Sequence, residues 1–482
     1  MKLHIVGAVG TAATAALVAC TSPAVASDWR QPNANLRGTR AVASPISSRT
    51  VASLQLRWRF PLTHGSTFGS FASTPLVVGD TVYAQDLSSS VHAIDARTGG
   101  VRWTFRVQAP NDGPNGVAVA GARIFGATDT SVFALDRRTG RRLWARRLVN
   151  RHEQFVDIAP LAARGLVFTS TIGFAPGGRG ALYALDQRTG RIRWRFETIR
   201  DPWSFPSAGG GGAWYPPSIA ADGRLYFGIS NPGPWGGSPL RPNGGMYPGP
   251  VPYTDALLTL TASRGSLLWY DQVTKHDVRD YDFEASPIIA GRVVFGAGKG
   301  GRVVAWDRVS GKRLWSRAVG THLHDLGPLP QRPTTVCPGL WGGVLTPMAY
   351  AQGRLFVPVV ERCMRESAVD PAFPADLTRG NGVLVALSAK TGRQAWSRRL
   401  GSPTTGCATV AGDVVFVPTL EGRVFALAAA DGRTLWQTQT RAGINGCPSV
   451  AGGLLLVGAG APTVNGHGVP ELSAYSLPGY GS

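Results

Sequence analysis

The sequence feature that most restricts the fold is a repeat that ends in a tryptophan. In its clear copies a β-rich segment ends in Ala-Leu-Asp or a close variant, a turn containing Thr-Gly follows, and the tryptophan comes a few residues later; the other copies are weaker. The three clearest copies occupy residues 93–103, 134–144 and 184–194. Asp bonds its own backbone in such a turn, and Gly takes the positive φ that the turn needs. The repeat predicts a series of similar β-units rather than several unrelated domains.

The two ends of the chain predict that these units close into a ring. Seven copies end at Trp103, Trp144, Trp194, Trp269, Trp315, Trp396 and Trp436. An eighth tryptophan, Trp58, lies in a strand-like segment (residues 54–62) that no other strand precedes, and residues 471–475 form a strand that no tryptophan follows. Joined in space, the two segments complete an eighth unit, and closure removes exposed sheet edges. We therefore predict an all-β, eight-bladed β-propeller, closed by its N- and C-terminal strands, with the tryptophans as structural residues between blades.

Two insertions mark the face where a binding site is expected. Most neighbouring tryptophans of the repeat are 40 to 50 residues apart, but Trp194 and Trp269 are 75 apart and Trp315 and Trp396 are 81 apart. Insertions in a propeller lie in loops on one face. Residues 200–254 and 320–382 are therefore the expected positions of functional loops.

The N-terminus predicts export from the cytoplasm. An apolar run over residues 5–18 follows Lys2 and ends in Leu-Val-Ala-Cys at Cys20, which resembles a lipoprotein lipobox. The alternative is ordinary cleavage after the A-x-A site at residues 24–26. We predict a signal peptide over residues 1–26 and a single propeller domain over residues 28–482. The protein is then extracytoplasmic, either secreted or anchored to the outer face of the membrane through a lipid at Cys20.

The remaining four cysteines are interpreted as two disulfides of an oxidising compartment. Three pairings are possible, and two bonds are favoured. Cys337 and Cys363 share one insertion, and Cys407 and Cys447 occupy the same place in consecutive repeats. The sequence contains no C-x-x-C-H, which excludes a covalent c-type haem in this chain.

The positive charge of the chain does not predict a nucleic-acid partner. The formal charge is +20, and nearly all of it comes from arginines that are scattered through the repeats. No nucleic-acid-binding motif accompanies them. A solvated, arginine-rich face is the simpler interpretation.

The start of the mature chain resembles a known family. Residues 28–35, 39–40, 44–46 and 54–58 are similar to the opening of the quinoprotein alcohol dehydrogenases, and the resemblance extends along essentially the whole mature chain. Those proteins are eight-bladed propellers that bind pyrroloquinoline quinone (PQQ) and a metal ion on the ring axis. The resemblance therefore implies PQQ and either Ca²⁺ or a lanthanide as cofactors.

Two loop segments resemble the metal-binding part of that site. Residues 228–235 are similar to the family's G-x-G-N-P-x-P-W, which assigns Asn231 to the metal and the cofactor, although Asn-Pro-Gly-Pro is also a good turn. Residues 275–282 are similar to H-D-x-W-D-Y, which makes Asp280 the catalytic carboxylate and a metal ligand. Asp282 completes a D-Y-D pattern that resembles the lanthanide-using branch. Residues i and i+2 of an extended segment point the same way, so both carboxylates could reach one cation.

Three further residues are assigned to the cofactor. Lys299, in a glycine-rich segment, takes the place of the family's basic residue that donates to the quinone oxygens. A compact ammonium between glycines suits a small anionic ligand. Trp214 lies near the position of the tryptophan that stacks beneath the planar cofactor, and Trp341 matches another segment that lines the site.

Two departures from the family pattern affect the site. The family's glutamate metal ligand aligns with Ala175, and the adjacent-cysteine pair that caps the cofactor in many members would fall near residues 109–110 and is absent. The arginine beside that pair is Asn115 in this chain. Asp282 could restore the lost negative charge.

The sequence thus predicts an exported, PQQ-dependent dehydrogenase. It would oxidise a small-molecule or polymeric alcohol and pass electrons to an external acceptor; polyvinyl-alcohol-type dehydrogenases are a plausible subgroup. The alternatives are a non-catalytic surface propeller similar to the outer-membrane assembly propellers, and a quinoprotein that binds PQQ or metal without turnover. A scaffold would not need Asn231, Asp280 and Lys299 to converge on one cavity, whereas the enzyme would.

Overall fold

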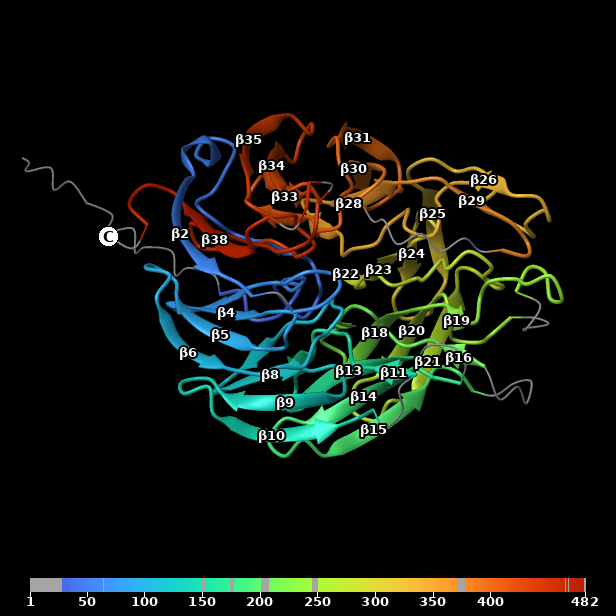
Figure 1. Cartoon of the computed structure of the whole chain (residues 1–482), viewed down its shortest axis with the longest axis horizontal. Helices are drawn as coiled ribbons and strands as arrows, with labels where there is room; N and C mark the ends of the chain where they lie inside the picture. Colours follow the sequence, from blue (N-terminus) through green and yellow to red (C-terminus); the bar gives the residue numbers. More distant parts are fainter. Residues whose placement is uncertain are drawn as a thin grey trace, which may run out of the picture.

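The chain forms a ring of eight sheets around a central axis, six of them four-stranded and two extended to five strands (Figure 1). The computed structural model describes residues 28–480 except positions 64, 150–152, 174–176, 201–207, 245–249, 371–377, 464 and 467. The predicted signal peptide, its lipobox cysteine Cys20 and Ala175 lie outside the described residues. The 3₁₀-helix Val51–Ser53 is the only helix in the described part of the chain. The predicted all-β, eight-bladed propeller is confirmed.

Each blade begins at a short inner strand and ends at an outer strand. Blade 1 runs from β3 (Leu76–Val78) to β6 (Val101–Phe105), blade 2 from β7 (Ala118–Ala120) to β10 (Arg142–Arg147), blade 3 from β12 (Leu161–Ala163) to β15 (Ile192–Glu197), blade 4 from β17 (Ser218–Ile219) to β21 (Leu267–Gln272), blade 5 from β22 (Ile288–Ala290) to β25 (Arg313–Ala318), blade 6 from β27 (Ala349–Ala351) to β31 (Gln394–Arg399), and blade 7 from β32 (Thr409–Ala411) to β35 (Thr434–Gln439).

Blade 8 closes the ring with both ends of the chain. It contains β36 (Ser449–Ala451), β37 (Leu454–Ala459), β38 (Glu471–Ser476) and β2 (Gln55–Pro61). Strand β2 pairs antiparallel with β38, with Trp58 opposite Ala474, and the blue and red ends meet in Figure 1. This pairing confirms the predicted closure by the N- and C-terminal strands.

The repeated tryptophans connect neighbouring blades, as predicted. The indole N–H of Trp103 donates to Arg137 O in the next blade (3.2 Å), and that of Trp194 donates to Ala262 O (2.8 Å). For seven of the eight tryptophans, the turn glycine of the next blade lies against the ring. At Gly190, which has a φ of +68°, an added Cβ would lie 2.6 Å from the Trp144 ring. The Thr-Gly turn therefore requires glycine both for its backbone conformation and for the close approach of the tryptophan.

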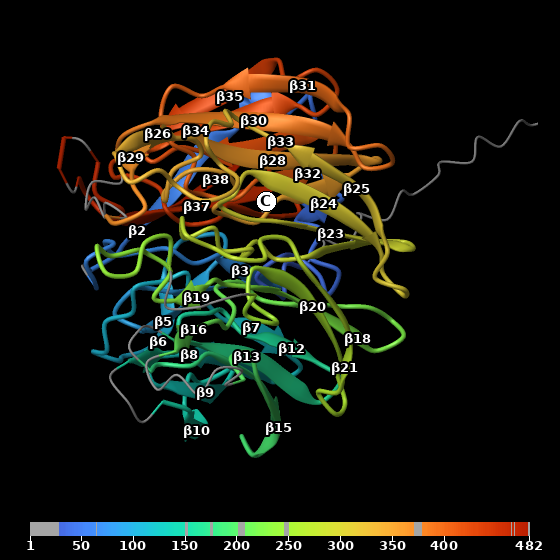
Figure 2. The ribbon, with the colours of Figure 1, turned by 90° about the vertical axis from the view of Figure 1, so that its right-hand side faces the viewer.

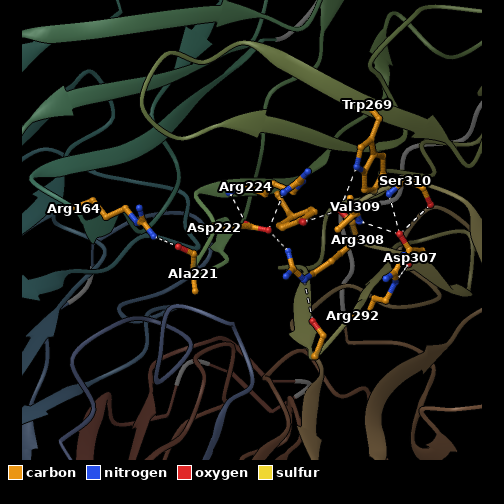
Figure 3. A network of polar contacts seen from close by, with 12 residues as sticks. Arg164, Ala221, Asp222, Arg224, Trp269, Arg292, Asp307, Arg308, Val309 and Ser310 are labelled. Carbon is orange, nitrogen blue, oxygen red and sulfur yellow. Dashed lines mark hydrogen bonds and ion pairs between the residues drawn. The ribbon is translucent and has the colours of Figure 1, made fainter.

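The turn aspartates bond their own backbone, and further ion pairs connect the blades. Asp136 Oδ1 accepts hydrogen bonds from the N–H groups of Arg138 (3.1 Å) and Thr139 (2.9 Å). Figure 3 shows the junction of blades 4 and 5, where Asp222 accepts from both Arg224 (2.8 Å) and Arg308 (2.5 Å). Arginines scattered through the repeats thus take part in contacts between blades.

A collar formed by residues 29–44 runs along the inner strands of all eight blades. Trp29 exchanges two backbone hydrogen bonds with Val77 of blade 1 (2.8 and 3.0 Å). The collar then accepts or donates bonds at blades 2 to 7, and Ser44 donates to Gly452 O in blade 8 (2.5 Å). The collar satisfies backbone groups on the innermost strand edges, which would otherwise be unpaired.

Arg40 fixes the centre of this collar. Its side chain is fully buried, and the guanidinium donates to the backbone oxygens of Pro32, Ala408 and Pro448 and to side-chain oxygens of Asn33 and Thr409. All of these acceptors are uncharged. Burial lowers the pKa of Arg40 to about 9.

The two insertions pack together on one face of the ring. The side chain of Asn243 donates to Leu329 O (3.0 Å) and accepts from Leu329 N–H (2.6 Å), which joins the first insertion to the second. In Figure 2, β19 (Pro232–Gly233), β26 (Thr334–Val336) and β29 (Met364–Glu366) lie toward the left-hand face of the disc. The disulfides Cys337–Cys363 and Cys407–Cys447 are both formed, as predicted. The described chain contains no helix long and apolar enough to span a bilayer.

Candidate active site

A cavity of 970 Å³ lies on the ring axis, on the side of the insertions. All six residues that the sequence assigned to the site line this cavity: Trp214, Asn231, Asp280, Asp282, Lys299 and Trp341. They come from segments that lead into the inner strands of blades 4, 5 and 6 and from the loops after β18 (Arg224–Ile229) and β23 (Val293–Ala297). Residues far apart in the sequence are therefore brought together at one point, as the enzyme hypothesis required.

At the centre of the site one ammonium lies between two carboxylates. Lys299 Nζ is 2.7 Å from Asp280 Oδ2 and 2.6 Å from Asp282 Oδ2. The same ammonium lies 5.4 Å from the centre of the Trp341 ring, within the range of a cation–π contact. Glycines on both sides allow this approach, because an added Cβ at Gly298 would lie 2.1 Å from Asp282 O.

Asn231 contacts both carboxylates from another side. Its side-chain amide donates to Asp280 Oδ1 (2.8 Å), and its backbone N–H donates to Asp282 Oδ1 (2.8 Å). Each carboxylate thus accepts one bond from Asn231 and one from Lys299. The two aspartates are held in fixed orientations by charged and neutral donors together.

A single chain segment, residues 279–284, carries the aspartates and separates the axial cavity from a second pocket. From residue 279 to residue 284 the side chains alternate: Asp280, Asp282 and Glu284 line the axial cavity, while Arg279, Tyr281 and Phe283 line the second pocket on the other side. Neighbouring side chains therefore point to opposite sides of this segment, as they do in a strand, although Asp280 itself has a φ of +62°. Glu284 is a cavity residue that the sequence analysis missed.

Burial has a strong effect on the acids around the site. It raises the pKa of Asp280, although the neighbouring Lys299 ammonium opposes the shift. Burial also raises the pKa of Asp277 to about 7, and it raises the pKa of Asp255 and of Glu284 well above their usual values. Burial alone would lower the pKa of Lys299. The charges of Asp280, Asp282 and Glu284 outweigh burial, so the pKa of Lys299 lies well above its usual value. The cluster has more acids than cations, and this surplus favours an added positive charge.

The donor set suits a planar anionic cofactor. Trp214 and Trp341 offer aromatic faces, Lys299 offers a cation, and the indole Nε1 of Trp214 is buried without a hydrogen-bond partner in the described chain. A cofactor with acceptor groups would satisfy that donor.

The set also offers hard oxygen ligands to a cation. Asn231, Asp280 and Asp282 supply amide and carboxylate oxygens of the kind that Ca²⁺ prefers. Within the described residues, no three His, Cys, Asp or Glu side chains are arranged as a metal site. In this structure the Lys299 ammonium takes the position between the two carboxylates.

Comparison with known proteins gives consistent results. A family profile described as outer membrane protein assembly factor BamB, with the short name PQQ_2, matches residues 38–196, 87–332 and 380–472. The chain is 28% identical to a quinohemoprotein alcohol dehydrogenase of Comamonas testosteroni over 82% of this chain and 67% of that protein. It is 24% identical to a lanthanide-dependent methanol dehydrogenase of Methylacidiphilum fumariolicum over 82% of this chain and 77% of that one.

Two kinds of solved propeller structure superimpose on this chain to different extents. The Comamonas testosteroni quinohemoprotein alcohol dehydrogenase superimposes with a TM-score of 0.81 at 24% identity, covering 94% of this chain and 81% of that chain. BamB from Moraxella catarrhalis superimposes with a TM-score of 0.55 at 14% identity, covering 89% and 98%. At these identities the structures compare folds only, and the fold is closer to that of the quinohemoprotein.

Proposed function

This chain belongs to the PQQ-dependent quinoprotein alcohol dehydrogenase family, and from that premise we propose that it oxidises an alcohol by hydride transfer to PQQ. The observation that carries the proposal is the convergence of Asn231, Asp280 and Lys299 on one cavity. The signal peptide predicted at residues 1–26 exports the protein. Because the sequence contains no haem motif, electrons pass to an external acceptor.

The proposed cofactor contacts follow from the chemistry of the cavity wall. Trp214 and Trp341 provide the aromatic surfaces against which a planar cofactor packs, and Lys299 and Asn231 provide hydrogen-bond donors and charge. PQQ supplies the electron-accepting chemistry that no side chain has. The protein's part is to position the substrate and to handle its proton.

Asp280 acts as the general base. The reaction requires removal of the hydroxyl proton of the alcohol while hydride leaves its carbon. The carboxylate of Asp280 lines the cavity, and the Lys299 ammonium at 2.7 Å favours its ionised form against the effect of burial. Burial in turn makes the carboxylate a stronger base than an exposed aspartate, which suits it to this role.

Asn231, Asp280 and Asp282 would hold Ca²⁺ or a lanthanide. A cation held by these three residues would neutralise the surplus of buried acids and would supply Lewis acidity to the quinone.

Reconstitution tests the proposed function. Purified protein is mixed with PQQ plus Ca²⁺ or La³⁺, and reduction of an acceptor dye is followed with small and polymeric alcohols. We expect alcohol-dependent reduction that falls by about 10²–10⁴-fold in Asp280→Asn, as for loss of a general base. Equal turnover in wild type and variant would contradict the role of Asp280. A preference for La³⁺ over Ca²⁺ would support Asp282 as a ligand of the metal ion.

A second candidate function is a non-catalytic propeller scaffold, anchored through a lipid at Cys20. The description of the matching family profile favours it. A scaffold has no reason to bind PQQ, so fluorescence titration of the tryptophans with PQQ separates the two. Quenching that saturates at one PQQ per chain contradicts the scaffold, and turnover in the reconstitution assay then separates the dehydrogenase from a quinoprotein without turnover. Absence of quenching with either cation supports the scaffold.

A further inference from the structure

The backbone at Asp280 has an unusual conformation. Its φ is +62°, in the left-handed region that residues other than glycine rarely adopt. This conformation turns the Asp280 side chain into the axial cavity, beside Lys299 and Asn231, while Arg279 and Tyr281 on either side face the second pocket. A carboxylate in such a conformation needs neighbouring contacts that hold it there.

Asp277 makes those contacts. Its Oδ1 accepts the N–H of Arg279 (2.9 Å), and its Oδ2 accepts the N–H of Tyr281 (2.7 Å). The two amides are those immediately before and after Asp280. Asp277 is itself almost completely buried, so these bonds are not exchanged with bulk water. One carboxylate therefore fixes the backbone on both sides of the left-handed residue.

The side chains next to Asp280 are anchored as well. Arg279 Nε donates to His324 O (3.0 Å), and the Tyr281 hydroxyl donates to Pro338 O (2.6 Å). Both acceptors belong to the insertion between blades 5 and 6. The insertion thus holds the side chains of this short loop, and Asp277, which belongs to the loop itself, holds its backbone.

We propose that Asp277 is a positioning residue for catalysis, which holds the Asp280 carboxylate in its reactive orientation by bonding the two amides that flank it. The inference rests on the proposed function, because it assumes that Asp280 takes the substrate proton. Asp277 lines the second pocket and not the axial cavity, so it contacts neither substrate nor cofactor.

The blades provide a matched control for this role. Asp136 accepts the N–H groups of residues two and three positions later, as Asp277 accepts those two and four positions later. Asp136 lies in an outer turn, far along the chain from the site and outside both pockets. Loss of its carboxylate removes similar bonds without affecting Asp280.

The test compares Asp277→Asn, Asp277→Ala and Asp136→Ala in protein reconstituted with PQQ and its preferred cation. We expect kcat to fall by about 100-fold in Asp277→Ala, because a small displacement of a catalytic group has an effect of that order. Asp277→Asn keeps one acceptor oxygen and should lose about tenfold, an intermediate value on the same scale. In both variants KM and the PQQ affinity, measured by tryptophan quenching, should stay within about twofold of wild type. Asp136→Ala should keep its kcat.

The outcomes are distinguishable. A wild-type kcat in Asp277→Ala, with Asp280→Asn inactive, would overturn the inference and leave the proposed function intact. Loss of PQQ binding in Asp277→Asn, or an equal fall of kcat in Asp136→Ala, would also overturn it, since either would indicate a general structural role. Full activity of Asp280→Asn would overturn both proposals. If Asp277→Ala does not fold, the kcat and PQQ affinity of Asp277→Asn decide alone.

Discussion

Two places in the molecule hold one cation between two aspartates. In blade 1, Arg102 pairs with Asp80 and Asp95, both at 2.7 Å. On the ring axis, Lys299 pairs with Asp280 and Asp282 at 2.7 and 2.6 Å. The geometry is nearly the same, but the surroundings differ. The Arg102 side chain is 35% exposed and the Lys299 side chain 7%.

The difference in exposure reverses the electrostatics of the carboxylates. The hydrogen bond from Arg102 holds the pKa of Asp80 and of Asp95 below the usual range. Burial raises the pKa of Asp280 in spite of an equally close cation. The exposed group is a surface ion pair of the repeat. The buried group is an assembly of charges that the fold keeps out of water and that a ligand can use.

The largest expected effect comes from removing the buried cation. Lys299→Met should destabilise the protein by about 3–5 kcal/mol, because two carboxylates would remain buried without a charged partner. Arg102→Met should cost only about 0–1 kcal/mol, since water and salt already screen that pair. Urea denaturation measures the free energy of unfolding of both variants. Equal slopes of the transition confirm that the variants unfold in the same way.

A double variant sharpens the comparison. In Lys299→Met/Asp282→Asn one of the two unpaired charges is gone, so part of the lost stability should return relative to Lys299→Met alone. Equal losses in Lys299→Met and Arg102→Met would contradict the view that burial, and not pairing geometry, separates the two sites.

A smaller effect is expected from the contacts between blades. Trp194→Phe keeps an aromatic ring beside Gly265 but removes the indole N–H that donates to Ala262 O. The loss should be about 1 kcal/mol or somewhat more, since the smaller ring also packs less well. The melting temperature measures it, with PQQ affinity as a second readout. If PQQ affinity fell as well, the blade contacts and the axial site would be more closely coupled than the comparison assumes.

The fold could be predicted because its signal is repeated. Each blade carries its own tryptophan, blades 1 to 7 carry a turn glycine that lies against the tryptophan of the preceding blade, and blades 1, 2, 3 and 5 carry the turn aspartate. Weak local patterns therefore reinforce one another around the ring. The two end strands, at residues 54–62 and 471–475, gave the closure because each was half of the same unit. The collar was not predicted, since residues 29–44 contain no periodic pattern and their partners are spread over the whole chain.

The candidate site could be predicted only in part. Asn231, Asp280 and Lys299 were found through resemblance, and no local rule indicates Asp277, whose role depends on the turn that it stabilises. Glu284 had a signal that was not used. Ala72, Asp157, Glu284 and Asn445 each stand three residues before a proline that precedes or begins an inner strand, and all four line the axial cavity. The repeat register therefore predicts which residue of a blade faces the axis, although it does not predict their mutual distances.

Glu366 offers a third case, a buried acid that no cation touches closely. Neither carboxylate oxygen accepts a hydrogen bond of good geometry in the described chain. Burial raises the pKa of Glu366 to about 7, and the charges of Asp277 and Asp280 add to the rise, although the charge of Arg279 and the nearby Leu340 N–H lower it. No cation lies as close to Glu366 as Lys299 lies to Asp280, so the effect of burial prevails.

The expected effect of Glu366 on stability appears only as a dependence on pH, and its sign follows from linkage. Between its unfolded pKa of about 4.5 and its folded pKa of about 7, the folded chain retains a proton that the unfolded chain has lost. Stability from this group is therefore present at low pH and is lost as pH rises toward 7. Glu366→Gln cannot titrate, so its melting temperature should fall less than that of wild type between pH 5 and pH 8. Asp277, with a pKa of about 7, titrates in both proteins and so contributes to both profiles. If the melting temperatures of wild type and Glu366→Gln changed equally with pH, Glu366 would be paired in solution. Burial alone would then not distinguish the axial acids from those of the outer turns.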